Sequence, residues 1–351
     1  MKTKHEIIFG DSRNMNSISD SSVNLVLTSP PYPMIEMWDE LFIDQNPLIN
    51  EALLSNDGNL AFELMHNELN KVWSESYRVL KDGGYACINI GDATRTLNKN
   101  FQLYPSHAKV LLSCKEIGFN TLPGLIWRKQ TNSPTKFMGS GMLPPGAYVT
   151  LESEHILLLR KSKKREFTNE TEKINRRKSA FFWEERNQWF SDLWGELKGS
   201  KQALHSDNLR DRSAAYPLDL SYRLINMFSV QGDTVLDPYL GTGTTTLGAI
   251  ASGRNSIGIE LDGSFKNHIH ERIHENKKFI KSYVQKRIKN HLNFIKQSES
   301  LNNSFKHTNI QYSFPVKTSQ EIDMVIPILE DITLSSNGVY TATYSDKKDF
   351  Y

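Results

Sequence analysis

Short apolar runs alternate along most of the chain with stretches in which apolar residues recur at helical spacing. The runs predict buried strands at residues 6–9, 23–27, 85–90, 121–127, 155–160, 234–236 and 254–261. Between them, helical spacing covers residues 60–80, 106–119 and 219–230. Strands that alternate with helices of this length predict an α/β fold built on a doubly wound, mostly parallel sheet.

Two parts of the chain depart from this alternation. Residues 160–178 carry nine Lys or Arg against three Glu, and six aromatic residues follow by residue 194. A basic run beside aromatics is typical of a nucleic-acid-facing insert, but a surface segment whose aromatics pack onto the core has the same composition. Further on, an apolar stripe over residues 264–300 predicts one long helix, and the pattern assigns no role to residues 301–351.

Composition limits the class of protein but does not indicate an activity. The 351 residues suffice for a large α/β core with an inserted or appended module. The formal charge is only +2, so affinity for nucleic acid must come from local clusters of basic residues. The two cysteines have no metal or disulfide spacing, and no window resembles a signal peptide or a membrane span. We therefore expect a cytoplasmic protein.

The strand at residues 23–27 ends abruptly in the sequence TSPPYP, residues 28–33. Three prolines in four positions cannot continue a central strand or begin an ordinary helix, so the chain leaves the sheet in a stiff, extended turn. This turn presents the Ser29 hydroxyl, main-chain carbonyls with few competing N–H groups, and the Tyr32 ring. Such a set suits a flat base that is held by its amino group and by its face.

A second stretch that carries chemistry, VLDPYLGTGT, spans residues 235–244. Gly241 and Gly243 allow a tight turn at which the backbone approaches a ligand near the start of the next helix. Glu260 ends the following strand, where an acid accepts hydrogen bonds from ribose hydroxyls. This arrangement fits a dinucleotide as well as an adenosyl ligand. Thr246 stands where the dinucleotide-binding motif has its third glycine. This difference argues against a dinucleotide ligand but does not exclude it.

These stretches resemble the motifs of one family. DPYLGTGTT with Glu260 resembles the S-adenosylmethionine-binding motif of DNA methyltransferases, and TSPPY resembles their amino-methylation motif. The catalytic stretch precedes the cofactor stretch, as in the permuted β class. The resemblance implies the circularly permuted S-adenosylmethionine-dependent methyltransferase fold. It divides the chain into a catalytic half (1–159), a target-recognition insert (160–211), a cofactor-binding half (212–262) and a C-terminal helix and extension (263–351).

The resemblance also implies roles for residues of the two stretches. Ser29 Oγ and the Pro30 carbonyl would accept the two hydrogens of an exocyclic amino group, beside Pro31. Tyr32 would stack on a base that has swung out of double-stranded DNA. Transfer of the methyl group from S-adenosylmethionine would be direct, aided by alignment and electrostatics and without a metal. The residues implied to bind this cofactor are Asp11, Asp237, Tyr239, Gly241, Gly243, Thr244 and Glu260.

The first residue of the acceptor motif bears on the choice of base. In the resembled family, Ser at this position usually accompanies methylation at N4 of cytosine, whereas Asp or Asn usually accompanies N6 of adenine. The stretch that follows, PMIEMWDELF, resembles N4-cytosine enzymes that act on CTAG sites. We therefore expect a site-specific cytosine-N4 methyltransferase that protects DNA from a cognate restriction endonuclease. N6-adenine methylation, and a non-catalytic DNA-binding protein with a degenerate core, are the alternatives.

Other reactive side chains offer no competing chemistry. Methylation at carbon 5 of cytosine needs a thiolate, but Cys87 and Cys114 lie in a predicted strand and helix, as core residues do. Asp92 could line the pocket, although a turn acid at a strand end is the commoner explanation. Five histidines are scattered without ligand spacing, so no metal site is expected: His5, His66, His107, His155 and His205.

Overall fold

The structure, a computed structural model, describes residues 1–129, 138–197, 216–301 and 304–345. Within these residues the centre is a ten-stranded sheet in the order β10-β6-β9-β3-β2-β11-β12-β1-β16-β15. Strands β3, β2, β11, β12 and β1 run parallel, and antiparallel strands join them on both sides, which confirms the predicted mostly parallel α/β sheet. The strands are β1 (Lys2–Phe9), β2 (Val23–Thr28), β3 (Leu80–Ile90), β6 (Asn120–Arg128), β9 (Ser153–Arg160), β10 (Leu193–Trp194), β11 (Thr234–Asp237), β12 (Asn255–Glu260), β15 (Ile328–Leu334) and β16 (Tyr340–Ser345).

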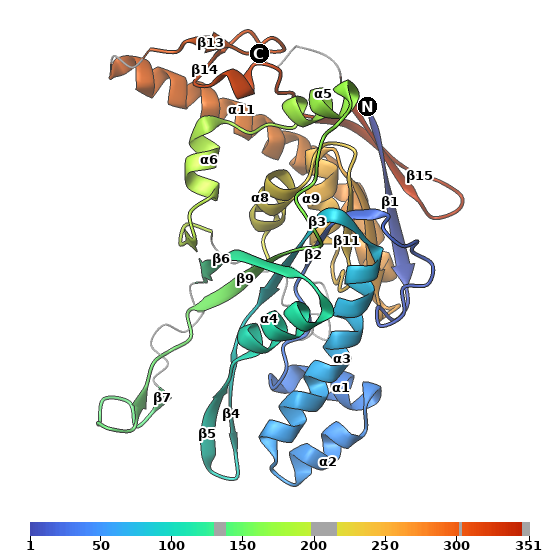
Figure 1. The fold of residues 1–351 in the computed structure, drawn as a ribbon, viewed down its shortest axis with the longest axis vertical. Helices are drawn as coiled ribbons and strands as arrows, with labels where there is room; N and C mark the ends of the chain where they lie inside the picture. Colours follow the sequence, from blue (N-terminus) through green and yellow to red (C-terminus); the bar gives the residue numbers. More distant parts are fainter. Residues whose placement is uncertain (130–137, 198–215, 302–303, 346–351) are drawn as a thin grey trace.

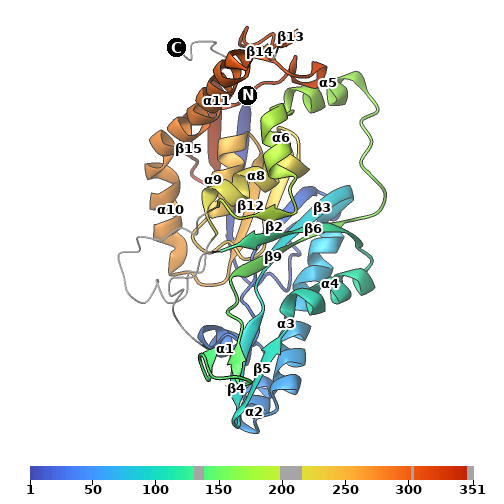
Figure 2. The ribbon, with the colours of Figure 1, turned by 90° about the vertical axis from the view of Figure 1, so that its left-hand side faces the viewer.

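Helices cover both faces of this sheet (Figure 1, Figure 2). α3 (Gly58–Val79) and α4 (Ser106–Ile117) pack on one face, and α8 (Leu218–Phe228) and α9 (Thr244–Ser252) pack on the other. All six residues of β2 are buried because both of its faces are covered. None of the described helices has the length and apolarity needed to cross a membrane. Three short helices precede α3 in the chain: η1 (Glu36–Trp38), α1 (Asp39–Gln45) and α2 (Leu48–Leu54).

The two strands that carry the predicted site are neighbours at the centre of the sheet. Val235 and Leu236 of β11 pair with Leu25 and Val26 of β2, as expected from the resembled fold. α3 connects β2 to the next parallel strand, β3, and α9 connects β11 to β12. These two helices pack on opposite faces of the sheet. The chain therefore winds away from this pair in two directions, and a ligand crevice forms at the carboxyl ends of such strands.

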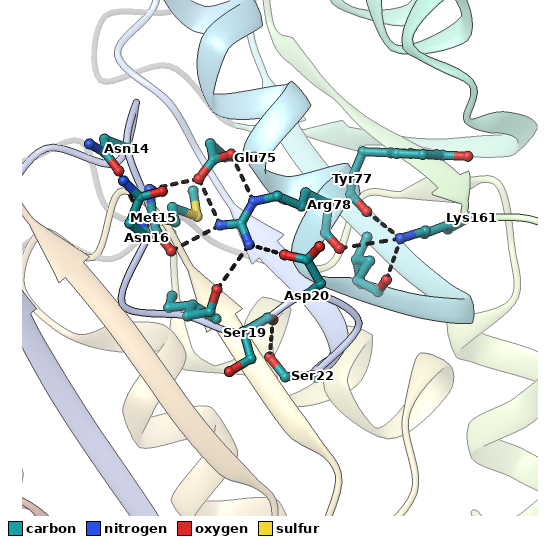
Figure 3. A network of polar contacts seen from close by, with 12 residues as sticks. Asn14, Met15, Asn16, Ser19, Asp20, Ser22, Glu75, Tyr77, Arg78 and Lys161 are labelled. Carbon is teal, nitrogen blue, oxygen red and sulfur yellow. Dashed lines mark hydrogen bonds and ion pairs between the residues drawn. The ribbon is translucent and has the colours of Figure 1, made fainter.

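The loop between β1 and β2 is fixed to the C-terminal end of α3 (Figure 3). Arg78 forms ion pairs with Glu75 and Asp20 and donates a hydrogen bond to the Met15 carbonyl, and Glu75 accepts the Met15 N–H. Lys161, which follows β9, donates to main-chain carbonyls at the same helix end, where a cation complements the helix dipole. These contacts hold in place the loop that contains the predicted cofactor residue Asp11.

The C-terminal part differs from its prediction. Residues 264–300 form two helices, α10 (Phe265–Glu275) and α11 (Lys277–Ser300), rather than one. Asn276 separates them, and its side-chain amide donates to the Arg272 carbonyl. Strands β15 and β16 form a hairpin that extends the sheet beside β1. The segment before this hairpin contains β13 (His307–Thr308), β14 (Pro315–Val316) and η2 (Ser319–Glu321).

The basic and aromatic segment packs against the C-terminal helices. It forms α5 (Glu170–Lys178) and α6 (Trp183–Trp189), at the end of the sheet where β1 begins and opposite to the carboxyl ends of the parallel strands (Figure 1). Phe182 stacks on His291 of α11 with ring centroids 3.8 Å apart, and Arg287 of α11 pairs with Glu185 at 2.6 Å. The structure therefore favours the packing alternative for the described part of the predicted insert. Residues 198–211 lie outside the described residues.

Two hairpins extend from the opposite end of the sheet (Figure 1). One joins β4 (Ala93–Leu97) to β5 (Asn100–Tyr104), and the other joins β7 (Met138–Gly139) to β8 (Ala147–Tyr148). The rings of Phe101 and Tyr148 stack with centroids 4.5 Å apart, so the hairpins contact each other. The β4–β5 hairpin follows β3, which ends beside Tyr32 of the predicted acceptor stretch. The β7–β8 hairpin precedes β9, which begins beside the same residue.

Candidate cofactor and acceptor site

A cavity of about 260 Å³ opens at the carboxyl ends of the central parallel strands, between β1, β2, β11 and β12. The two predicted stretches, about two hundred residues apart in sequence, meet in its wall. Gly243 is the one predicted site residue that does not line the cavity, and it lies directly before α9. The lining contains the remaining predicted residues, namely Asp11, Ser29, Pro30, Pro31, Tyr32, Asp237, Tyr239, Gly241, Thr244 and Glu260.

The glycine turn after β11 brings main chain to this cavity. Gly241 and Gly243 have φ angles of +54° and +84°, in the left-handed region that favours glycine. A Cβ at Gly241 would meet nothing within 4 Å, so backbone conformation rather than crowding explains the glycine there. Thr244 begins α9, and within the described residues its buried Oγ1 has no hydrogen-bond partner. That hydroxyl and the N-terminus of α9 leave polar groups for a ligand.

Glu260 closes the cavity at the end of β12. One carboxylate oxygen accepts the Gly241 N–H at 2.7 Å, and the other accepts the Asp262 N–H at 2.9 Å. Burial nevertheless raises the pKa of Glu260 to about 7, because desolvation outweighs these hydrogen bonds. Each carboxylate oxygen keeps a lone pair with which it can accept a ribose hydroxyl.

Asp237 joins the two halves of the site. It is only 2% exposed, and it accepts hydrogen bonds from Thr28 Oγ1 at 2.7 Å, from the Tyr239 N–H at 3.0 Å and from the hydroxyl of Thr245. Tyr216, which precedes α8, adds a longer contact of 3.4 Å. Burial raises the pKa of Asp237. Thr28 directly precedes Ser29, so one carboxylate fixes the cofactor turn against the acceptor turn.

Asp11 lies on the far side of the cavity, two residues after β1. Phe9 of β1 pairs with Glu260, so the loop passes beyond the position expected for a ribose. Arg13 donates to both Asp11 oxygens and also pairs with Glu68 of α3 at 2.6 Å. Burial of Asp11 opposes its ionisation, but the hydrogen bonds from Arg13 outweigh burial and lower the pKa of Asp11. The carboxylate is therefore charged and fixed in orientation.

The acceptor turn places a hydroxyl and an aromatic ring together. Ser29 Oγ lies 3.1 Å from Tyr32 Oη. The Tyr32 ring lies against Gly91, where a Cβ would meet ring carbon Cε2 at 2.9 Å, so any other side chain at position 91 would displace the ring. Burial and the nearby Glu154 carboxylate raise the pKa of Tyr32 well above its usual value, which keeps the phenol protonated.

Three side chains at the site escaped the sequence analysis. Tyr216 lines the cavity, Arg13 fixes Asp11, and Glu154 accepts a hydrogen bond from Tyr32. Tyr216 and Arg13 lie outside the two motifs, although each is close in sequence to a predicted element. Glu154 directly precedes a predicted strand, and nothing in the neighbouring sequence distinguishes it from an exposed acid at a strand end.

The thiols behave as expected, whereas the histidine interpretation needs a correction. Cys87 and Cys114 are buried, and burial raises the pKa of both thiols far above neutrality.

His107 and His155, predicted to be scattered, stack with ring centroids 3.9 Å apart beside Asp92. Sheet pairing of β3 with β9 and the start of α4 bring these side chains together. Asp92 accepts the His107 N–H at 3.0 Å and its Nδ1 at 2.8 Å, so it caps α4 rather than lining the cavity.

Comparison with known sequences identifies the family. Residues 23–272 match the family model described as DNA methylase. The chain is 54% identical over 325 residues to the type II methyltransferase M.MthZI of Methanothermobacter thermautotrophicus, which covers 92% of this chain and 90% of that protein. It is 50% identical over 282 residues to the type II methyltransferase M.MjaI of Methanocaldococcus jannaschii, covering 77% and 91% of the two chains.

Solved structures agree with this assignment. A protein described as a DNA modification methylase from Thermus thermophilus, solved with S-adenosyl-L-methionine, matches with a TM-score of 0.59 and 31% identity over 76% of this chain and 92% of that chain. The PvuII cytosine-N4-specific DNA methyltransferase shares the fold, with a TM-score of 0.51 and 17% identity over 77% and 86%. The glycine turn, the Thr244 hydroxyl, which no described residue contacts by a hydrogen bond, and Glu260 fit an adenosyl cofactor. The chain therefore belongs to the DNA methylase family, and it is an S-adenosylmethionine-dependent DNA methyltransferase.

Proposed function

We propose that the protein is a site-specific methyltransferase of the permuted β class that modifies N4 of cytosine in double-stranded DNA. The observation that carries this proposal is Ser29, which lines the same cavity as the cofactor turn. Ser at the first position of the acceptor motif is the residue that usually accompanies N4 of cytosine in this family. The similarity to type II methyltransferases supports a role beside a restriction endonuclease that reads the same site.

The chemistry depends on how the acceptor turn holds the target base. When bound, S-adenosylmethionine supplies an electrophilic methyl group. An exocyclic amino nitrogen is a poor nucleophile because its lone pair is delocalised into the ring. Ser29 Oγ and the Pro30 carbonyl would accept its two hydrogens, make the nitrogen more tetrahedral and aim its lone pair, while Tyr32 stacks on the flipped base.

The cofactor residues receive distinct roles in this proposal. Glu260 would accept the ribose hydroxyls with the lone pairs left by its two main-chain donors. Asp11, held charged by Arg13, would accept the adenine amino group. The Thr244 hydroxyl and the main chain of the Gly241 turn would face the polar tail of the cofactor. Asp237 would act mainly by fixing the turn, because its oxygens already accept several hydrogen bonds.

Binding of S-adenosylmethionine should depend on pH through Glu260. Ribose hydroxyls donate to the ionised carboxylate, and a carboxyl with a pKa of about 7 is partly protonated in slightly acidic solution. Wild-type affinity is therefore expected to rise by up to about tenfold from pH 6 to pH 8. Glu260→Gln should bind about tenfold more weakly at the higher pH and lose the pH dependence. Titration calorimetry checks this, and a wild-type affinity that is flat across this range would contradict it.

For recognition of the DNA sequence we propose the β4–β5 and β7–β8 hairpins. They extend from the end of the sheet that holds the cavity, whereas α5 and α6 pack at the other end (Figure 1). Arg95 of β4 pairs with Asp39, at the start of α1 and close to the cavity residues Trp38 and Glu40. This contact ties one hairpin to the rim of the site. Base edges in the grooves would be read from this side.

Expression in a host without the modification tests the proposal. Sequencing that distinguishes modified bases should find N4-methylcytosine at one short sequence throughout the host DNA, and the resemblance to CTAG enzymes makes CTAG the first candidate. The same experiment with Ser29→Ala is the matched control and should leave the DNA unmodified. N6-methyladenine at a defined sequence would overturn the choice of base, and unmodified DNA with the wild-type protein would overturn the activity.

A further inference from the structure

A buried polar network lies behind Ser29 and Tyr32. Tyr32 Oη donates to Glu154 Oε2 at 2.9 Å, and Ser29 Oγ lies 3.1 Å from the same phenol oxygen. Asn89 Nδ2, from β3, lies 2.6 Å from Glu154 Oε2 and 3.0 Å from Tyr32 Oη. Glu154 is only 9% exposed, and its other oxygen lies 2.8 Å from Lys129 Nζ. The network therefore ends in a carboxylate whose two oxygens both have donors.

Counting protons fixes the direction of each hydrogen bond. A carboxylate only accepts, so the single Tyr32 phenol proton must point to Glu154. The amide of Asn89 must turn its NH₂ toward the same carboxylate, and its two protons are directed to the two short contacts, while its contact with Ser29 Oγ is longer, at 3.4 Å. Tyr32 Oη is then available to Ser29 only as an acceptor. The Ser29 hydroxyl proton therefore points to Tyr32, away from the cavity.

We propose that Glu154 is a positioning residue that makes Ser29 a hydrogen-bond acceptor toward the target base. With its proton committed to Tyr32, Ser29 Oγ presents lone pairs to the cavity. Lone pairs favour an amino group, which donates, over a carbonyl, which accepts. This inference rests on the proposed function, because it takes the amino group of a base as the group that Ser29 meets. It adds to that function a residue that controls which exocyclic group the site accepts.

Replacing Glu154 by Gln should reverse the chain of hydrogen bonds. Lys129 can only donate, so it would hold the amide oxygen of the new side chain and turn its NH₂ toward Tyr32. The Asn89 amide, 2.6 Å from this position, would turn its oxygen toward the new NH₂, and Tyr32 Oη would accept from the same NH₂ and donate to Ser29. The Ser29 hydroxyl proton would be released toward the cavity, where it suits a carbonyl and opposes an amino group. The change keeps the size of the side chain, so its effect is on polarity.

The test compares binding of two DNA duplexes to the full chain with S-adenosylhomocysteine. The duplexes carry the mapped target sequence with cytosine or uracil at the target position, each opposite an abasic nucleotide so that neither base is paired. The wild type should prefer cytosine by about 10- to 100-fold, and Glu154→Gln should lower this preference about tenfold. The same variant should lose at least about tenfold in the single-turnover rate with unchanged KM for the cofactor.

Two further variants make the outcome decisive. Tyr32→Phe removes the hydroxyl that joins Ser29 to Glu154 and should also lower the preference for cytosine. Glu152→Gln changes a 40% exposed acid that pairs with Arg128, and it should leave the preference unchanged. Retention of the wild-type preference by both Glu154→Gln and Tyr32→Phe would overturn the role of Glu154 alone. A wild type that transfers no methyl group and does not distinguish the duplexes would instead overturn the proposed function on which this inference rests.

Discussion

Tyr32→Ala is expected to lower the single-turnover rate of methyl transfer by about a hundredfold or more, while the affinity for S-adenosylmethionine stays within about threefold of the wild type. Stacking on an aromatic ring is worth about 1–3 kcal/mol per base, and loss of the ring also removes the acceptor for the Ser29 proton. The cofactor meets other residues of the cavity, above all Glu260 and the Gly241 turn.

The measurement pairs single-turnover kinetics with titration of the cofactor in the absence of DNA. Tyr32→Phe serves as the matched variant, because it keeps the ring and removes only the hydroxyl, and it should retain most of the stacking contribution. Equal losses in methyl transfer and in cofactor affinity for Tyr32→Ala would contradict the assignment of the ring to the base.

Asp237→Ala is expected to abolish measurable cofactor binding and to lower the free energy of unfolding by about 3 kcal/mol or more. The buried carboxylate accepts hydrogen bonds from Thr28, Thr245 and the Tyr239 N–H, and its removal takes this acceptor away from all three donors, of which Thr245 retains a contact with the Tyr216 hydroxyl. Because the same carboxylate holds the acceptor turn against the cofactor turn, methyl transfer should be lost at every cofactor concentration.

A second buried acid, Asp233, directly precedes the same strand and allows the effect on stability to be separated from the effect on function. Asp233 lies at the opposite end of β11, is 7% exposed, and pairs with Arg165 at 2.7 Å. Asp233→Ala should also destabilise the protein, but well below its unfolding temperature it should bind S-adenosylmethionine as the wild type does. Thermal unfolding and calorimetry on both variants check this. Wild-type cofactor affinity in Asp237→Ala would contradict the role given to that residue.

The central part of the fold was predictable from the sequence because local pattern and long-range packing agree there. The apolar run of β2 is continuous because both faces of the strand are covered, and the two motifs lie where strands end. The prolines at 30, 31 and 33 and the glycines at 241 and 243 restrict or free the backbone whatever surrounds them. The local backbone conformation at these residues can therefore be predicted from the sequence alone.

The parts that escaped prediction depend on partners far away in the chain. The apolar stripe continues across Asn276, so periodicity alone cannot show that the helix breaks there. The aromatic residues at the start of α6 find their partners on α11, about a hundred residues later, and the pairing of Arg287 with Glu185 joins the same two helices. Glu154 acquires its role only because β9 lies beside β3, which places it against Tyr32.

The central claim is tested most directly by identifying the methylated nucleoside. The purified protein is incubated with S-adenosylmethionine labelled in its methyl group and with duplex DNA, and the DNA is then digested to nucleosides and separated. We expect the label in N4-methyldeoxycytidine with the wild type and in no nucleoside with Ser29→Ala. Label in N6-methyldeoxyadenosine would contradict the assignment of Ser29 to cytosine.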